Sequence, residues 1–428
     1  MKVRWSRNFL ALGAPLLVLV SFGCQVSGNA TGTPTATTTA TPAALSADLP
    51  DDLLIPESPD GVQHVPVVSV SPEAEFSLVA EKDGAILEPV AAYRQGFIVT
   101  SKTLQPNHPE GWATEFLYWE PGNGSMDVLW ATADDCIEQV AAIFNDAVVT
   151  NCSLPGNGPA ATTVYTVDPR NGQRAEIEPP QTAFALDSGF PSPPDRSGRY
   201  LAWTGRSSGF HGQVDELWVY DVETDTLRTI VTIDQSATPN REPRPIWSVS
   251  TAGDLVAWGE QRSPAAEPGV NLLNLRTGER WSTEIDYRPQ LIWLAPNGNS
   301  LILSGPESGS ASATAESTQA RPLPKYVVDL EDGEVHLLAV DYQWSDFSTS
   351  TNRRYLAWSQ PHPLQAASVF DSETLTRYDF DGVRAFAAIE VMGEWLVWRE
   401  YAPRADGVEG ADLTRSYAHF MRLDNLGK

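Results

Sequence analysis

The sequence Arg-Tyr-Leu-Ala-Trp occurs twice in this chain, at residues 199–203 and 354–358. Two identical five-residue segments so far apart indicate a repeated structural unit. Related apolar segments recur along the chain, and most begin with the glycine or asparagine that is typical of a turn leading into a buried strand. The seven segments are QGFIVTS (95–101), NDAVVTN (145–151), GRYLAWT (198–204), GDLVAWG (253–259), NSLILSG (299–305), RRYLAWS (353–359) and GEWLVWR (393–399).

A second series of segments alternates with the first, and each of its members has the pattern of a β-hairpin. An apolar strand ends in an acidic residue or an asparagine, a turn follows, and a second strand begins. These hairpins cover residues 116–129, 164–177, 217–230, 271–283, 326–338 and 368–380. A further apolar strand precedes most segments of the first series, as at 137–144, 244–250, 290–296 and 385–391. Each repeat therefore contains four antiparallel strands, named A to D here, and spans about 40–55 residues, which predicts an all-β chain folded as a β-propeller with seven four-stranded blades.

The seventh repeat lacks its last strand, because only one strand, at residues 416–423, follows its strand B. An open sheet edge would expose unpaired backbone groups. Two spare apolar segments precede the first blade, at 65–70 and 75–82. We expect one of them, with residues 76–81 preferred, to supply the missing strand and close the ring. The predicted propeller covers residues 62–428, with the closing strand within 65–82 and the blades from about residue 86.

The repeated strand C and its turn, seen as LWVYDVETDTLRTI at 217–230, resemble those of β-propellers of the TolB-like and WD-repeat-like type. The resemblance extends over roughly residues 75–428 and implies the architecture, with little information on activity. The diagnostic Trp-Asp pair of WD repeats is absent from its usual strand end. The chain therefore does not match the WD-repeat pattern itself.

The N-terminus has the pattern of an export signal at residues 1–23. Basic residues at positions 2, 4 and 7 precede an apolar run at 9–22, which is too short to span a membrane comfortably and suits the apolar region of a signal peptide. The following SFGC resembles bacterial lipoprotein signals, which implies a lipid on Cys24. Gly23 matches that pattern, whereas Ser21 and Phe22 depart from it. The alternative is ordinary cleavage after a small-x-small motif, which would leave Cys24 as a free thiol.

Residues 24–61 are rich in Thr, Ala and Pro and carry little to bury, so we expect a disordered tether between the lipidated cysteine and the propeller. Together these features predict a protein of the cell envelope, exported and held to a membrane by its lipid. The formal net charge of −26 makes nucleic acid an improbable partner, because such a surface repels phosphates. We expect a monomer.

Cys136 and Cys152 flank the predicted hairpin of strands A and B in the second blade. A turn near Asn145 would place them close enough for a disulfide, which export permits. A register slip of one residue would turn the two side chains to opposite faces, so a reduced pair is the alternative.

The chain carries no motif for a metal, a cofactor or a catalytic centre. The single G-x-S-x-G match, at 205–209 with Ser207 at its centre, lacks the following helix that a nucleophile elbow needs. The six histidines are scattered without ligand spacing. Two recurrent series have structural interpretations. Trp203, Trp258, Trp358 and Trp398 share one strand-B position and are expected in the core between blades. The polar series Asp168, Asp221, Asn274, Asp329 and Asp371 is expected to stabilise the turns between strands C and D.

Two functions remain open. The first is a non-catalytic binding or scaffold module for a protein, peptide or glycan, without a cofactor. The alternative is a glycan- or peptide-processing enzyme at the propeller axis, which would need at least two carboxylates; the visible candidates are Glu88, Glu138 and Glu390. We favour binding, because strands A are poor in acids. The connections between strands B and C are long and share one face, which we call the B–C face. Binding residues favour loops on a rigid scaffold. The candidates on that face are Lys102, His108, Trp112, Arg206, His211, Arg262, Arg399 and Tyr401.

Overall fold

The computed structural model describes most of the repeat region and none of the N-terminal 54 residues. The described residues are 55–56, 59–105, 112–122, 124–132, 137–144, 147–153, 162–177, 199–209, 212–234, 245–263, 265–289, 291–295, 298–305, 322–342, 346–349, 354–359, 367–380, 389–403 and 411–426. By internal contacts the chain divides into residues 1–40 and 41–428, and all described residues belong to the second unit. The predicted signal peptide and Cys24 thus lie outside the described residues, as does most of the predicted tether.

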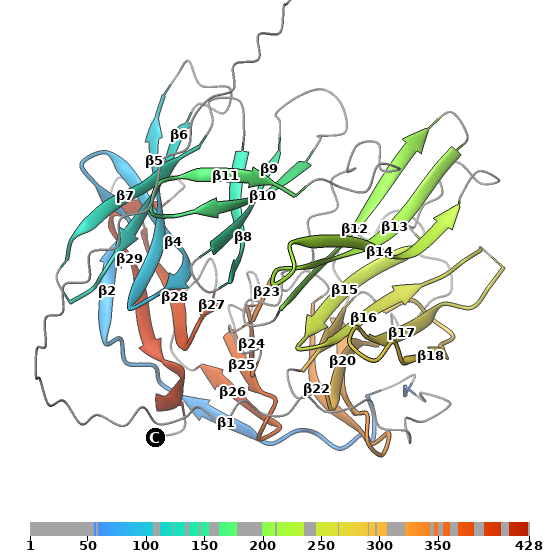
Figure 1. The fold of residues 1–428 in the computed structure, drawn as a ribbon. Coiled ribbons are helices and arrows are strands. Elements are labelled where there is room, and N and C mark those ends of the chain that lie inside the picture. The colour runs from blue at the N-terminus through green and yellow to red at the C-terminus, as the bar shows by residue number, and fades with distance from the viewer. Residues whose placement is uncertain are drawn as a thin grey trace, which may run out of the picture. The chain divides into compact units, whose positions relative to one another are not determined.

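The described residues form seven β-sheets, whose strands Figure 1 colours in chain order. The first sheet contains β3 (Glu81–Lys82), β4 (Ala85–Tyr93), β5 (Gly96–Leu104), β6 (Trp112–Trp119) and β7 (Met126–Ala131). The second contains β8 (Ile137–Phe144), β9 (Ala147–Ser153), β10 (Thr162–Asp168) and β11 (Gln173–Glu176), and the third β12 (Tyr200–Gly209), β13 (Gly212–Asp221) and β14 (Thr226–Asp234). The fourth contains β15 (Ile246–Ala252), β16 (Leu255–Glu260), β17 (Gly269–Asn274) and β18 (Arg280–Glu284).

The remaining three sheets are built in the same way. The fifth contains β19 (Ile292–Leu294), β20 (Ser300–Ser304), β21 (Pro322–Asp329) and β22 (Val335–Tyr342). The sixth contains β23 (Asp346–Thr349), β24 (Tyr355–Ser359), β25 (Ala367–Asp371), β26 (Thr376–Phe380) and β1 (Val67–Val70), and the seventh β27 (Ile389–Met392), β28 (Trp395–Pro403), β29 (Ala411–Arg422) and β2 (Phe76–Val79). One short 3₁₀ helix, Leu423–Asn425, is the only helix among the described residues.

The chain folds as an all-β, seven-bladed propeller, which confirms the prediction from the repeats. Strands that follow one another along the chain pair antiparallel. The second, fourth and fifth blades have four such strands, the third has three in its described part, and the seventh has three, which β2 joins. The first sheet has the additional strand β3, and the sixth has the additional strand β1. The core lies between consecutive blades. One apolar cluster, for example, joins Val256 and Trp258 of the fourth blade to Leu217 and Val219 of the third.

The four strand-B tryptophans are buried as predicted. Trp203, Trp258, Trp358 and Trp398 expose 2, 0, 1 and 7% of their surface, and each belongs to an apolar cluster between blades. They are therefore part of the core and do not form an aromatic ligand box.

The repeated Arg-Tyr-Leu-Ala-Trp sequence has the same structure in both copies. In the third blade, Arg199 Nε and Nη2 donate to both carboxylate oxygens of Asp221, at 2.8 and 2.6 Å. In the sixth blade, the guanidinium of Arg354 donates in the same way to Asp371, at 2.9 and 2.7 Å. Each arginine also lies over the ring of the tyrosine that follows it. This bidentate pair joins the start of strand B to the end of strand C, which explains why these residues recur together.

The polar series at the ends of strands C stabilises turns, as predicted. In every member, the side-chain oxygen accepts the backbone N–H of the residue two positions later, at 2.7–3.1 Å. This is an Asx turn, which favours the tight connection between strands C and D.

The segment that precedes the first blade pairs with several sheets. β1 lies parallel to β26 of the sixth blade, and β2 is antiparallel to β29 of the seventh. β3 forms a hairpin with β4 of the first blade. The two segments named as candidates for the closing strand thus both form strands. That the pairing of β2 closes the ring stays a prediction.

The connections on the B–C face are shorter than the sequence indicates. In the third blade, strand B continues to Gly209 and strand C begins at Gly212, so the connection that the sequence predicts to be long has only two residues. In the first blade, strand B ends at Leu104 and strand C begins at Trp112. In the seventh blade, strand B ends at Pro403 and strand C begins at Ala411. Polar and glycine-rich sequence was interpreted as loop there, but cross-strand pairing extends the hairpins beyond the apolar core. Within the described ranges, no helix is long and apolar enough to cross a bilayer.

Candidate functional site

The structure places the predicted binding residues of the B–C face mostly within strands. Lys102 lies in β5, Trp112 begins β6, Arg206 lies in β12, and Arg399 and Tyr401 lie in β28. Arg262 follows the end of β16 in the connection to β17. His108 and His211 lie outside the described residues. Ser207 lies within β12, so the G-x-S-x-G match is part of a strand and not of a strand–turn–helix elbow.

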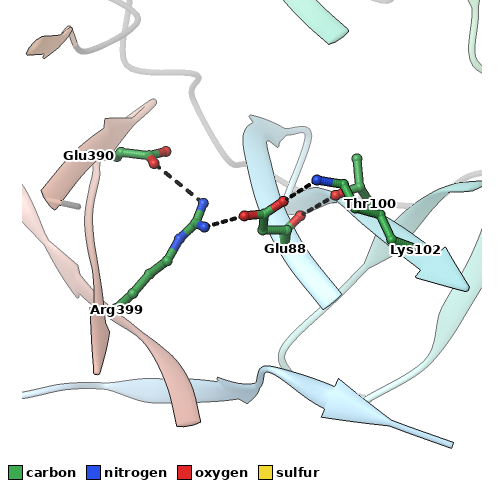
Figure 2. Close-up of polar contacts among 5 residues, drawn as sticks. All are labelled: Glu88, Thr100, Lys102, Glu390 and Arg399. Carbon is green, nitrogen blue, oxygen red and sulfur yellow. Dashed lines mark hydrogen bonds and ion pairs between the residues drawn. The ribbon is translucent and has the colours of Figure 1, made fainter. Parts of the chain in front are cut away.

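Four charged side chains meet where the seventh blade adjoins the first, and we call them the Arg399 cluster: Glu88, Lys102, Glu390 and Arg399 (Figure 2). Lys102 Nζ donates to Glu88 Oε2 at 2.7 Å. The Nη1 of Arg399 donates to the other oxygen of Glu88, while its Nη2 lies 3.4 Å from Glu390 Oε1. Two carboxylates thus share one guanidinium, and one of them has a second cation.

The strand register places the Arg399 cluster at the B–C end of both blades. In the first blade, Glu88 pairs with Thr100, only a few residues before β5 ends at Leu104. In the seventh blade, Trp398 pairs with Ile389, the first residue of β27, so Arg399 lies just beyond the start of strand A. Both glutamates come from strands A, on which the sequence places the candidate axial carboxylates. The cluster therefore combines two of the predicted binding residues with two of the predicted axial carboxylates.

The electrostatics of the Arg399 cluster favour the ionised form of Glu88. Burial alone would raise the pKa of Glu88, but Arg399 and Lys102 together outweigh burial and hold this pKa below its ordinary value. The guanidinium of Arg399 has only 17% of its side-chain surface exposed, and the two glutamates raise its pKa against the effect of burial. The cluster is thus a fixed network of paired charges at neutral pH.

Glu138, the third axial candidate, does not take part in this network. It lies in β8 of the second blade, where Arg174 Nη2 donates to its Oε2 at 2.7 Å. Burial raises the pKa of Glu138, because only 7% of the residue is exposed, and the nearby Arg174 counteracts this only in part. The structure therefore brings Glu88 and Glu390 together but gives Glu138 its own partner.

A second charged group on the B–C face surrounds Glu260, the last residue of β16. This carboxylate is 6% exposed and accepts hydrogen bonds from Trp258 Nε1 at 2.9 Å and from Arg262 Nε at 2.6 Å. Arg280 Nη2 lies 3.4 Å from Glu260 Oε2, the oxygen that accepts the hydrogen bond from Trp258. Arg262 is one of the residues predicted from the sequence, whereas Glu260 is not. Its position two residues after a buried strand-B tryptophan could have pointed to it.

Cys152 is disulfide-bonded and 8% exposed. It pairs across the hairpin with Glu138, near the start of β8 at Ile137. Cys136, the residue just before that strand, lies outside the described residues. The pairing of Cys136 with Cys152 therefore stays a prediction.

Comparisons with known proteins add solved structures of low similarity. No protein-family model matches the chain, and no curated protein matches it. TolB from Acinetobacter baumannii is 14% identical over 66% of this chain, with a TM-score of 0.38, and the match spans 62% of the length of TolB. Oligogalacturonate lyase from Vibrio parahaemolyticus is 9% identical over 80% of this chain and 92% of its own, with a TM-score of 0.48. Acylaminoacyl peptidase from Pyrococcus horikoshii is 12% identical over 75% of this chain and 50% of its own, with a TM-score of 0.46.

Proposed function

We propose that this protein is an exported lipoprotein of the cell envelope, anchored through Cys24, and that its propeller acts at the B–C face as a non-catalytic binding or scaffold module for a protein, peptide or glycan. The observation that carries the proposal is the sharing of Arg399 by Glu88 and Glu390. It bears directly on the choice between binding and catalysis at the axis.

An axial enzyme that cleaves glycosidic bonds needs one carboxyl group that stays protonated to act as the acid, and a second that is ionised. The Arg399 cluster favours the opposite. Glu88 has a lowered pKa, and both glutamates contact the same guanidinium. Such an arrangement favours two ionised carboxylates and disfavours the protonated acid.

The same arrangement suits a binding surface. Preformed ion pairs hold their side chains in place, so a ligand meets ordered donors and acceptors. The exposed apolar side chain of Leu104, which is 62% exposed at the end of β5, pairs across the strands with Trp112 and adds contact area beside the charged groups. Polar anchors next to aromatic and aliphatic surface are typical of interfaces.

Site-specific photo-crosslinking in cells tests this proposal. A photoreactive amino acid at Leu104 on the B–C face should give a defined crosslinked species, whereas the same amino acid at Glu331 in a C–D turn of the opposite face should not. Digestion of the crosslinked species with a protease or with glycan-cleaving enzymes distinguishes protein from glycan. Crosslinking from Glu331 alone would overturn the assignment of the face. Hydrolysis of glycans or peptides by the purified protein, abolished in Glu88→Gln, would favour the axial enzyme instead.

A further inference from the structure

A chain of hydrogen bonds crosses three adjacent strands of the seventh blade, apart from the Arg399 cluster. The Ser77 hydroxyl of β2 lies 2.7 Å from His419 Nδ1 of β29. The other ring nitrogen, His419 Nε2, lies 3.2 Å from Glu400 Oε2 of β28. A hydroxyl, an imidazole and a carboxylate therefore follow one another in the order used by hydrolases that act through an activated serine.

The strand register explains why these side chains meet. Ser77 pairs with His419 across β2 and β29, and Trp398 pairs with His419 on the other side. Glu400 pairs with Tyr417, two residues before the histidine. Directly opposed residues and residues two apart project from the same face of a sheet, so all these side chains share one face of the blade.

Packing holds the imidazole while the hydroxyl stays accessible. The His419 ring lies between the rings of Trp398 and Tyr417, with centroids 5.4 and 6.0 Å away, and its side chain is 17% exposed. Ser77 is exposed. A substrate can therefore reach the serine oxygen without displacing the histidine.

Only one neutral tautomer of His419 satisfies both contacts. If Nδ1 carried the proton, the unprotonated Nε2 would face a carboxylate oxygen, and two acceptors would meet. With the proton on Nε2, that nitrogen donates to Glu400 and Nδ1 accepts the hydrogen of Ser77. The carboxylate thus fixes the ring in the form in which it can act as a base towards the hydroxyl.

The open edge of the sheet supplies a donor for a developing oxyanion. β2 is the last strand of its sheet, and the N–H of Ala80 donates to Ser416 O of β29. Backbone groups of successive residues in an antiparallel strand alternate in direction. The N–H groups of β2 that point away from β29 can therefore donate to an oxyanion beside Ser77.

We propose that Ser77 is the nucleophile of an ester-cleaving site on this face of the seventh blade, with His419 as its general base. Ser77 Oγ forms a bond to the carbonyl carbon of a carboxylic ester, and its proton passes to His419 Nδ1. The carbon–oxygen bond to the alcohol then breaks, and the alcohol leaves with that proton. Water, deprotonated by His419, cleaves the acyl-serine and restores the hydroxyl. Tyr417, 40% exposed beside the site, offers a surface for an aryl or short acyl group. Glu400 acts as a positioning residue. This activity goes beyond the proposed binding function and does not depend on it.

The test treats the full chain with a fluorophosphonate, a probe that reacts with activated serines, and locates the label by mass spectrometry. We expect the label on Ser77 and not on Ser69, an exposed serine of β1 that has no histidine contact in the described part of the chain. Labelling, and release of p-nitrophenol from p-nitrophenyl acetate, should fall at least ten-fold in Ser77→Ala and His419→Gln and stay unchanged in Ser69→Ala, since general-base assistance typically contributes ~10²–10⁴-fold.

The positioning role of Glu400 has its own readout. The carboxylate stabilises the charge that develops on the imidazole in the transition state, so Glu400→Gln should lower kcat for p-nitrophenyl acetate and leave KM unchanged. Circular dichroism confirms that each variant is folded. Equal labelling of parent and folded His419→Gln, or a label on other serines only, would overturn the proposal. An unchanged kcat in Glu400→Gln would remove Glu400 from it.

Discussion

Replacing Asp371 with alanine removes the ion pair with Arg354, which has a counterpart in the pair of Arg199 with Asp221 in the third blade. In the parent, both Asp371 oxygens accept hydrogen bonds from Arg354, and one of them also accepts the N–H of Glu373 at 3.1 Å. The Asp371 side chain is 3% exposed, so its partners cannot be replaced fully by water. Breaking one side of a buried pair costs about 3–5 kcal/mol.

Two features of the structure reduce this cost. The Arg354 side chain is 30% exposed, and its Nη1 keeps an ion pair with Glu373 at 2.7 Å. The arginine is therefore not left without a partner in the variant. We expect Asp371→Ala to lower the free energy of unfolding by about 2–4 kcal/mol, below the top of the usual range for a buried pair.

Asp329→Ala is the matched control. Asp329 occupies the same turn position in the fifth blade, and its Oδ1 accepts the N–H of Glu331 at 2.7 Å, but no cation contacts it among the described residues. It should lose only the turn hydrogen bond, worth about 0.5–1.5 kcal/mol. Urea unfolding measures both variants, with stability compared at an unchanged m-value. Equal losses in the two variants would refute the argument that the arginine pair stabilises the blade.

Three further outcomes are expected. Arg199 holds the pKa of Asp221 below its ordinary value. The pair therefore contributes its whole stabilisation above the unfolded-state pKa of about 3.9, and this stabilisation is lost as the pH falls through the lowered pKa of the folded state. Asp221→Asn should lose less stability than the parent between pH 5 and 2. A chain that begins at residue 60 should fold, whereas one that begins at residue 86, and thus lacks β2, should melt at a lower temperature; identical melting curves would contradict ring closure by β2. Cys24→Ser should move the protein from the membrane fraction to the soluble fraction, and unchanged membrane partition would exclude the lipid anchor.

The sequence predicted the blades well because the repeat is local. The positions of Trp258 and of Asn274 within a blade follow from the order of apolar and turn residues over a few dozen positions, and the structure confirms both their burial and their roles. The bidentate pair of Arg199 with Asp221 also lies within one repeat, only 22 residues apart. Such contacts recur with the repeat, so a single sequence can reveal them.

The ends of strands B and C were less predictable. Residues 204–215 contain Gly, Ser and Arg, a composition that favours a loop, but the pairing of Thr204 with Leu217 continues to Gly205 and Glu216 and on to Gly209 and Gly212. Pairing with a neighbouring strand can outweigh local composition, because strand propensity depends on context. The six candidate binding residues that the structure describes therefore lie mainly in strands.

The sequence named the four residues of the Arg399 cluster separately, but it did not show that they meet, and it did not show that Ser77 meets His419. Glu88 and Arg399 are 311 residues apart, and Ser77 and His419 are 342 residues apart. The repeat sets neither of these sequence separations, because each pair joins a residue before or in the first blade to a residue in the seventh. Whether the side chains meet depends on the pairing of β2 with β29 and on the contact between the seventh and first blades, and a shift of β2 by one residue would turn Ser77 to the opposite face. Chemistry at this junction is therefore created by the way the repeats come together, and a search for local motifs within single repeats cannot detect it.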